Sequence, residues 1–575
     1  MILRSTWQRY WHTLRHLRSV QFYGRLWFRL YRPRPELQPP PMRRLASWAW
    51  AAPLLRPVSM LGPARFRFLN QIYDVPGPEA WNDPALDKLW LYNLHYFDDL
   101  NAAKAPARAD WHRALVRRWI SENPPGQGNG WEPYPTSLRI VNWVKWLLRE
   151  SSTASAGTGD VAMIQSLVTQ AHWLRRRLEY HLLGNHLFAN AKALVFAGAF
   201  FVGPEAARWL RLGQRLLRRE LQEQILADGG HFERSPMYHA ILLEDVLDLM
   251  QLAQVYPNTL DAVLLHLCEE KAAAMQRWLT VMTHPDGRIS FFNDAAFDIA
   301  PRLADLGTYA EQLGIGAPPY TTRHPGREDG IQCCWLRDSG YVRLQAGPAV
   351  ALLDVAPIGP DYLPGHAHAD TLSFEVSLFG QRVIVNGGTS RYGSGPERLA
   401  ERGTAAHSTV QIDGVDSSEV WGGFRVARRA RPFDVVVSGA DARDATPGCQ
   451  VTAAHDGYRR LPGRPVHRRS WCLTGDGLAV IDTLEGDYTE AVARFHLHPA
   501  VQIAMDASTT PAGATGALSL PGGQSVAWGV TGGQVRLVDS HWHPQFGLSE
   551  PSKCLEVGIR GRECRLELLW ANSDG

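Results

Sequence analysis

The spacing of hydrophobic residues changes once along this chain, near residue 330. From about residue 83 to residue 313, apolar side chains recur every three or four positions, as in Leu138, Val141, Val144 and Leu148, which is the spacing of one helix face. Serial helices joined by short polar links are typical of a layered helical array. The pattern predicts helices that include 187–202, 204–226, 238–255 and 260–281.

After residue 330 the apolar residues alternate with polar ones. Leu372, Phe374 and Val376 occupy every second position, as in a strand with one buried face. Gly475-Asp476-Gly477 interrupts the stretch 471–481 in the way that a hairpin turn does. We therefore predict an antiparallel β-sandwich in this part of the chain.

These two patterns divide the chain into regions. We predict a basic and aromatic segment with a lead-in at 1–82, a helical domain at 83–313, a Pro- and Gly-rich linker at 314–330 and a sheet domain at 331–575. A chain of 575 residues, 45% of them hydrophobic, is too long for one ordinary core. Because clefts form readily where domains meet, we expect functional residues at this boundary.

Composition narrows the classes of partner. The formal net charge is only +3, so no global field favours nucleic acid, and we expect no nucleic-acid partner. The chain has 21 Trp residues, and indole rings suit the flat apolar faces of sugars. Any single Trp is nevertheless explained more readily by burial in a core.

The cysteines and the N-terminus bear on the compartment. Seven Cys residues form no CxxC pair and leave one over, which argues against a disulfide framework or a thiolate zinc site. Residues 1–30 lack the apolar stretch and cleavage site of a secretory signal. No run of eighteen apolar residues appears. We therefore expect a cytoplasmic protein.

Residues 1–35 are basic and aromatic. No acidic residue precedes Glu36, and Trp7, Trp11 and Trp27 lie among the arginines. Several arginines fall at helical spacing, so this segment is predicted to contact an anionic membrane surface peripherally. The alternative, a helix packed on the body with its arginines in water, stays open. The arginines are Arg4, Arg9, Arg15, Arg18, Arg25, Arg29, Arg32 and Arg34.

Four short stretches gather polar side chains against the local pattern: 184–187, 233–239, 366–370 and 407–409. Burying unpaired polar groups costs free energy, so we interpret these stretches as one divided active site. The pair Asn185-His186 either grips a carboxylate or caps the following helix. Tyr238 is useful as a base only if nearby positive charge or hydrogen-bond donors favour its phenolate. Otherwise this tyrosine simply begins a helix.

The sequence His-Ala-His-Ala-Asp at 366–370 is more specific. If it forms a strand, His366, His368 and Asp370 share one face, which suits metal binding or acid–base catalysis. The same spacing opens the metal site of metallo-β-lactamase-type hydrolases. In those proteins another His follows the Asp, whereas here Thr371 follows and no repeated βα units surround it.

Together, several motifs resemble those of the heparinase II/III polysaccharide lyases, in the same order from about residue 85 to the C-terminus. They are the stretches 184–186, 228–239, 366–370, 385–389 and 405–409. Such proteins pair an incomplete α/α toroid with an antiparallel β-sandwich. The resemblance therefore implies the fold class that the two hydrophobic patterns also predict.

The resemblance also implies an activity: β-elimination on a uronic-acid-containing polysaccharide. Removing the C5 proton beside a carboxylate builds charge on an already negative group, so that group must be neutralised. By the resemblance, Asn185 and His366 hold the carboxylate and Tyr238 transfers protons to or from the sugar. His186 or His239 supports the proton transfer.

Further site residues follow from the resemblance. His368 and His407 match positions at which relatives bind zinc, but Asn386 stands where the third ligand is an Asp. Neutral amides are weak zinc ligands, so we expect a weakened zinc site. Trp131, Arg139 and Trp143, with Tyr134, resemble the segment that lines the cleft, so we expect stacking on sugars and an Arg–anion pair. For Arg139 a solvated position on a buried helix is the open alternative.

Three functions remain open at this point. A lyase is the first, and a uronyl C5-epimerase, which shares the proton abstraction, is the second. A non-catalytic glycan-binding protein of a polysaccharide assembly system is the third. A cytoplasmic lyase rarely meets an external polymer, which favours a link to exopolysaccharide metabolism. The sequence predicts neither the sugar nor the oligomeric state.

Overall fold

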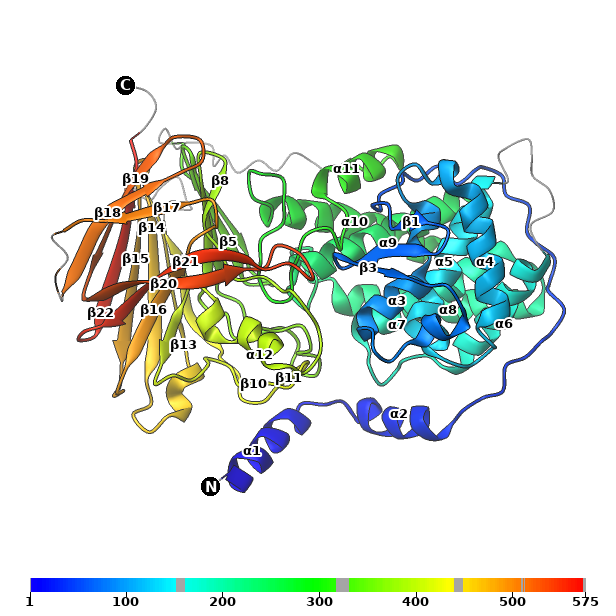
Figure 1. The fold of residues 1–575 in the computed structure, drawn as a ribbon, viewed down its shortest axis with the longest axis horizontal. Coiled ribbons are helices and arrows are strands. Elements are labelled where there is room, and N and C mark those ends of the chain that lie inside the picture. Colours follow the sequence, from blue (N-terminus) through cyan, green and yellow to red (C-terminus); the bar gives the residue numbers. More distant parts are fainter. Residues whose placement is uncertain are drawn as a thin grey trace.

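A computed structural model gives the chain as two bodies side by side, one helical and one built of sheets (Figure 1). It describes residues 2–150, 161–316, 330–438, 448–507, 510 and 512–571, with side chains from residue 6 onward. Most of the predicted linker, 317–329, lies outside the described residues.

The helical body forms because most of its helices bury an apolar face. Helices α7 and α9 are buried on nearly every side, as expected for helices that are apolar all round. Gly198 and Gly213 let α7 and α8 approach closely, since a Cβ on Gly213 would lie 2.7 Å from the Ala191 carbonyl oxygen. The helices are α3 (Lys88–Tyr96), α4 (Ala109–Glu122), α5 (Pro133–Glu150), α6 (Val161–Arg176), α7 (Gly184–Phe200), α8 (Pro204–Gln224), α9 (Pro236–Val255), α10 (Ala262–Val281) and α11 (Leu303–Gln312).

The lead-in contains more structure than the sequence predicts. Helices α1 (Ile2–Leu14) and α2 (Ser19–Leu30) precede a small antiparallel sheet of β1 (Met60–Gly62), β2 (Arg65–Phe68) and β3 (Gln71–Asp74). Buried Asp99 accepts the backbone N–H of Ser59 at 2.7 Å and of Met60 at 2.9 Å, which fixes β1 on the helical body.

The sheet body is antiparallel throughout its paired strands and stacks sheets face to face. One sheet has the order β12-β13-β14-β15-β22-β19-β18-β17, a second β20-β21-β16-β9, and a third β4-β5-β6-β7-β8. Strands β10 (Val420–Trp421) and β11 (Arg425–Val426) form a separate pair. Helix α12 (Pro396–Arg402) lies in the connection between β8 and β9. The remaining strands are β4 (Gln332–Leu336), β5 (Tyr341–Ala346), β6 (Ala349–Asp354), β7 (Phe374–Leu378), β8 (Gln381–Ile384), β9 (Val410–Ile412), β12 (Pro432–Ser438), β13 (Cys449–His455), β14 (Val466–Leu473), β15 (Gly477–Glu485), β16 (Ala491–His496), β17 (Gln502–Met505), β18 (Gly513–Ser519), β19 (Ser525–Thr531), β20 (Gly533–Trp542), β21 (Glu550–Ile559) and β22 (Glu563–Leu569).

A buried arginine ties sheet and loops together inside this body. Arg469 on β14 donates to Asp482 at 2.6 Å and to the carbonyl oxygens of Leu372 at 2.9 Å and Ser408 at 2.6 Å. A buried guanidinium needs such a full set of partners, because each unpaired donor would carry a desolvation penalty. The loops that precede β7 and β9 are thereby held in place.

Direct hydrogen bonds join the two bodies. Trp278 on α10 donates to Ser339 at 2.8 Å, and Tyr341 on β5 donates to the carbonyl oxygen of Arg234 at 2.7 Å. The predicted change from helices to antiparallel sheets is confirmed, and with it the fold class, an α/α toroid followed by a β-sandwich.

One local prediction is wrong: residues 366–370 form a loop, not a strand. His366, His368 and Asp370 therefore do not share one face. His366 contacts Glu233, His368 contacts Asp294, and Asp370 accepts the backbone N–H of Asn293. Among the described residues, no helix is both long and apolar enough to cross a membrane.

Candidate active site

Tyr238 and His366 meet at the boundary of the two bodies. Tyr238 lies in the first turn of α9, and Ser235 caps this helix by accepting the Tyr238 backbone N–H at 3.2 Å. The His366 ring, from the loop before β7, stacks on the Tyr238 ring with centroids 3.8 Å apart and planes 16° apart. The two predicted residues are thus in contact although 128 positions separate them (366 − 238).

Glu233 orients the imidazole. Its carboxylate lies 2.5 Å from His366 Nδ1, and its other oxygen is buried with no hydrogen bond among the described residues. Burial alone would raise the pKa of Glu233, but the neighbouring His366 outweighs it and lowers that pKa. A carboxylate on Nδ1 leaves Nε2 as the free nitrogen of the ring, the arrangement by which acidic residues position catalytic histidines.

Tyr392 completes the cluster from the loop after β8. Its hydroxyl lies 2.7 Å from the Tyr238 hydroxyl, and its ring stacks near His366 at 6.2 Å between centroids. Burial, with Tyr392 and Asp294 nearby, raises the pKa of Tyr238 well above its ordinary value. At neutral pH the resting Tyr238 is therefore a neutral phenol that can donate a proton.

Asn185 and His186 begin α7 beside this cluster. A Cβ on Gly184 would lie 3.0 Å from Glu233 Oε1 and 2.5 Å from Leu363 Cδ2. The start of α7 therefore packs directly against Glu233, the residue that holds His366. Asn185 is half-buried, and its side chain has no hydrogen bond to a described residue. An unengaged amide at a helix N-terminus is suited to an anion.

His186 carries a charge partner. Its Nδ1 lies 3.2 Å from Glu179, and its ring packs on Tyr134 at 4.5 Å between centroids. Burial lowers the pKa of His186, but Glu179 outweighs it and the pKa is raised. Glu179 therefore favours the protonated form of the imidazole beside Asn185.

Three of the residues with strained backbone lie in the loops that carry these side chains. Leu183, Arg234 and Leu372 have positive φ angles of 62°, 59° and 63°. Each such residue costs roughly 1–3 kcal/mol, and strain of this kind clusters at functional sites. Leu183 immediately precedes the turn into Asn185, so the chain is bent there to present that amide.

His368 and His407 lie behind this cluster and are fully buried. His368 Nδ1 is 3.2 Å from His407 Nε2, and His368 Nε2 is 2.8 Å from Asp294. Asp294 also binds the Arg398 guanidinium through both oxygens, at 2.7 Å for Oδ2. Burial raises the pKa of Asp294, but Arg398 and His368 more than reverse this and lower it strongly.

The residues around this histidine pair do not fit a zinc site. Asn386, the expected third ligand, accepts the Ser408 backbone N–H at 3.1 Å and donates to Ser373 at 3.2 Å, so its amide is occupied within the sandwich. Within the described ranges, no group of three His, Cys, Asp or Glu side chains is arranged for a metal.

The predicted sugar-binding residues require a correction. Trp131 and Trp143 are buried in the helical core, and Arg139 is 0% exposed, stacked over Trp119 at 3.8 Å and donating to Gln170 at 3.0 Å. All three side chains pack on Trp119 and do not reach a surface.

His239 is likewise a core residue and not positioned for substrate. Its Nε2 lies 2.9 Å from the Met275 carbonyl oxygen, and its ring stacks on Trp278 at 4.3 Å. Burial lowers the pKa of His239 to about 3, so it is a neutral hydrogen-bonding residue of α9.

Sequence reasoning missed Tyr392, Asp294 and the partner role of Glu233. Glu233 belongs to the polar stretch 233–239, so its position five residues before Tyr238 could have indicated that its carboxylate belongs to the site. Tyr392 and Asp294 had none, because each joins the site only through tertiary packing.

Sequence profiles of one family match most of the chain. The profile described as heparinase II/III N-terminus matches residues 97–309, and the profile described as heparinase II/III-like, C-terminal matches residues 332–571. The chain belongs to the heparinase II/III family. Its helical and sheet bodies are the two family domains, while α1, α2 and the small sheet precede the matched region.

Other proteins are similar to this chain over different lengths. A heparin-sulfate lyase of Pedobacter heparinus is 26% identical over 51% of this chain and 46% of its own length. FtsZ-localized protein C of Caulobacter vibrioides is 24% identical over 71% of this chain and 69% of its own length. The crystal structure of heparinase III superposes with a TM-score of 0.65 at 18% identity, over 88% of this chain and 80% of that one. The chain thus spans about half of the length of the Pedobacter heparinus lyase. The heparinase III structure shows that the two proteins share a fold.

Proposed function

We propose that this protein is a polysaccharide lyase that cleaves a uronic-acid-containing polysaccharide by β-elimination. The observation that carries the proposal is the contact of Tyr238 with His366 across the boundary of the two bodies, completed by Glu233 and Tyr392. Family membership supports it, because a heparin-sulfate lyase is among the relatives.

In this proposal, the start of α7 holds the uronate carboxylate. Asn185 supplies an unengaged amide, the first turn of α7 supplies backbone N–H groups, and His186 adds positive charge beside them. His366, with Nε2 free, binds the same carboxylate from the other side. Neutralising this group stabilises the enolate-like intermediate that forms when C5 loses its proton.

Tyr238 transfers the protons. Breaking the C5–H bond releases an electron pair that forms the C4=C5 double bond and expels the glycosidic oxygen from C4, which then takes a proton. The neutral phenol favoured by burial suits the second transfer. Tyr392, hydrogen-bonded to the same hydroxyl, fixes the direction of that phenol. The first transfer requires Tyr238 to give up its own proton when substrate binds, and neutralising the substrate carboxylate removes a negative charge that would oppose this loss.

The substrate is expected to be an acidic polysaccharide, and a link to bacterial exopolysaccharide metabolism is part of the proposal. The test uses purified protein with a panel of sulfated and unsulfated uronate polymers. We expect new ultraviolet absorbance from the conjugated double bond. Solvent deuterium entering C5 without absorbance would instead identify a C5-epimerase. Neither signal on any polymer, with binding retained, would identify a glycan-binding protein.

A further inference from the structure

The helix α2 has apolar side chains on two opposite sides. Its inner side rests on the body: the Phe28 ring packs on His181 at 4.4 Å between centroids, and Gln21 donates to the Tyr362 carbonyl oxygen at 3.0 Å. A surface helix normally turns polar residues outward. Here the outward side carries Phe22, Leu26 and Leu30, with Leu26 61% and Leu30 72% exposed, while Tyr23 and Trp27 are exposed beside the cavity between α2 and the body.

Helix α1 repeats this arrangement. Its inner side packs on the sheet body, where the Tyr10 ring contacts Trp421 at 4.9 Å and Trp421 donates to Thr13 at 3.1 Å. Trp7 and Trp11, one helical turn apart, are 74% and 67% exposed. Both helices lie along one edge of the molecule (Figure 1). We call their outward apolar side chains the N-terminal face.

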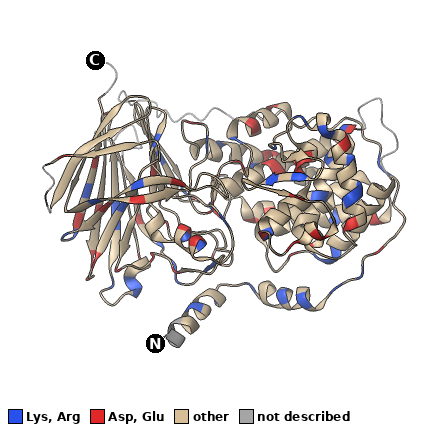
Figure 2. Cartoon of the chain, viewed as in Figure 1, with Lys and Arg blue, Asp and Glu red and all other residues tan. Residues whose placement is uncertain are grey.

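Positive charge accompanies this face. Arg25 and Arg29 flank Leu26 on the exposed side of α2, and no acidic residue occurs before Glu36. In Figure 2 both helices carry blue segments and no red ones. Exposed aromatic and aliphatic residues bordered by arginines, without acids, are typical of helices that lie in the interface of an anionic bilayer.

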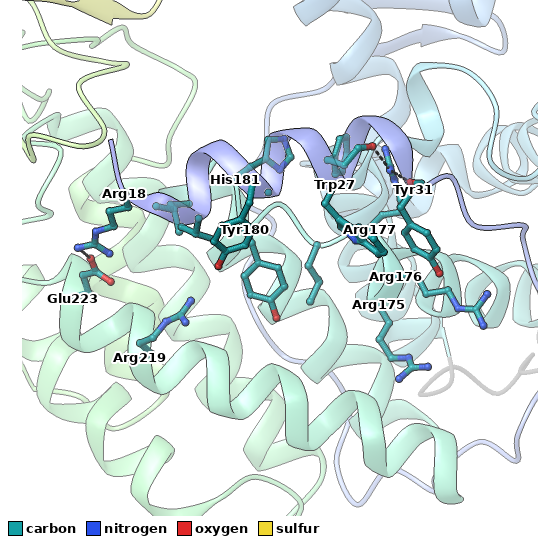
Figure 3. A pocket seen from close by; sticks show the side chains of 16 residues that line it. Arg18, Trp27, Tyr31, Arg175, Arg176, Arg177, Tyr180, His181, Arg219 and Glu223 are labelled. Atoms are coloured by element: carbon teal, nitrogen blue, oxygen red, sulfur yellow. Dashed lines mark hydrogen bonds and ion pairs between the residues drawn. The ribbon is translucent and has the colours of Figure 1, made fainter. Parts of the chain in front are cut away.

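The body beside α2 is also basic. A cavity of about 630 Å³ opens next to this helix, and Arg175, Arg176 and Arg219 project along its far side (Figure 3). Arg176 pairs with Glu36, whereas Arg175 Nε is buried with no hydrogen bond to a described residue. Arg219 pairs with Glu220, and Glu223, which also lines the cavity, pairs with Arg18, so the cavity is lined by more arginines than acids but most of these arginines have an acidic partner.

We propose that the N-terminal face docks the protein on an anionic lipid bilayer. Trp7, Trp11 and Leu26 enter the boundary between headgroups and acyl chains, and Arg25 and Arg29 contact lipid phosphates. The helices lie in the plane of the surface, because their inner sides stay attached to the body. This proposal is independent of the lyase reaction.

Flotation of the full chain with vesicles tests the proposal. Vesicles of phosphatidylcholine mixed with phosphatidylglycerol should bind the protein, and binding should fall as salt rises. The double substitution Trp11→Glu with Leu26→Glu should weaken binding by about tenfold or more, because it places charge in the apolar layer. Arg25→Gln with Arg29→Gln should reduce the preference for phosphatidylglycerol over pure phosphatidylcholine and leave the apolar face intact.

The matched control is Val263→Glu. Val263 is 64% exposed in the first turn of α10, outside the N-terminal face, and should leave vesicle binding unchanged. Thermal unfolding shows whether each variant is folded. Absence of wild-type binding to the anionic vesicles would overturn the proposal. So would a wild-type dimer that the Trp11→Glu and Leu26→Glu pair dissociates, because a second copy would then cover the face.

Discussion

Two histidines of one short stretch have opposite roles in this fold. His366 has a side chain that is 13% exposed, with one nitrogen on Glu233 and the other without a hydrogen bond to a described residue. His368, two positions later, is fully buried with both nitrogens engaged, by Asp294 and His407. Burial lowers the pKa of His368 to about 4 despite the Asp294 charge, so it stays neutral. One imidazole is available for chemistry and the other holds the loops.

Spacing in the sequence therefore does not distinguish a histidine that is available for chemistry from a structural one. The residues 366–370 follow an irregular path, so neighbouring side chains diverge. His366 turns to the helical body, while His368 turns into the sandwich. We call the first environment the Tyr238 cluster (Tyr238, Glu233, His366, Tyr392) and the second the Asp294 cluster (Asp294, His368, Arg398, His407).

The largest expected effect is on the Tyr238 cluster. Tyr238→Phe removes the proton-transferring hydroxyl, so turnover should fall about 100-fold or more, with substrate binding retained. Ultraviolet absorbance measures turnover, and a binding assay with an unreacted polymer measures affinity. The matched control is Tyr458→Phe, which removes a buried hydroxyl that donates to the Val410 carbonyl oxygen at 2.8 Å within the sandwich. Retained turnover in Tyr238→Phe would remove this residue from the mechanism.

The Asp294 cluster should respond in stability. Asp294→Asn leaves the buried Arg398 without its charge partner, so the free energy of unfolding should drop by about 3 kcal/mol or more. Urea unfolding measures this drop. Asp298→Asn breaks the pair with Arg288 at 2.8 Å, in which the carboxylate is 40% exposed, and should cost less than about 1 kcal/mol. Equal losses in the two variants would contradict the structural role of Asp294.

Glu233→Gln should show how much of the activity depends on the charge of this side chain, because glutamine has nearly the same shape. Glutamine keeps an acceptor for His366 Nδ1 but removes the negative charge, so turnover should fall by about tenfold. The loss should appear in kcat more than in KM, because Glu233 positions the imidazole and does not contact the sugar. A change in KM alone would show that Glu233 acts on substrate binding.

The stability of the protein at acid pH should depend on the same carboxylate, that of Glu233. The folded-state pKa of Glu233 is lowered, so its ionised form stabilises the fold above the unfolded pKa of about 4.5 and this stability is lost as pH falls through the folded pKa. The difference in unfolding free energy between wild type and Glu233→Gln should stay constant from neutral pH to about pH 4.5 and shrink below it. A difference that grows on acidification would reverse the assigned sign.

The smallest expected effect concerns zinc. Because Asn386 replaces a carboxylate and its amide is engaged by Ser373 and Ser408, protein purified without added ions should contain less than one zinc per chain. Elemental analysis measures this content. One zinc per chain, lost in His407→Gln, would show that the histidine pair and Asn386 rearrange around a metal.

The sequence predicts those features that arise from local chemistry. The alternation at Leu372, Phe374 and Val376 indicated a strand, and β7 covers Phe374 and Val376, whereas Leu372 precedes it in a turn and β7 is buried on both faces. Tyr238 and His366 were singled out by chemistry and lie together. Tyr392 could not be found in this way, because a lone tyrosine in a loop has no local signal.

The errors have a common physical cause. Trp131, Arg139 and Trp143 carry groups that suit sugars and also suit cores, and only packing decides between the two. In the interior Arg139 stacks over Trp119 and donates to Gln170, so its guanidinium does not reach a cleft in which a sulfate or uronate could bind.

The N-terminal helices have a mechanical consequence. Helix α1 contacts the sheet body through Trp421. Helix α2 contacts both bodies, because Phe28 packs on His181 of the helical body and Gln21 donates to the Tyr362 carbonyl oxygen of the sheet body. Helix α2 therefore bridges the boundary between the two bodies, and they cannot separate along this edge unless α2 loses one of these contacts.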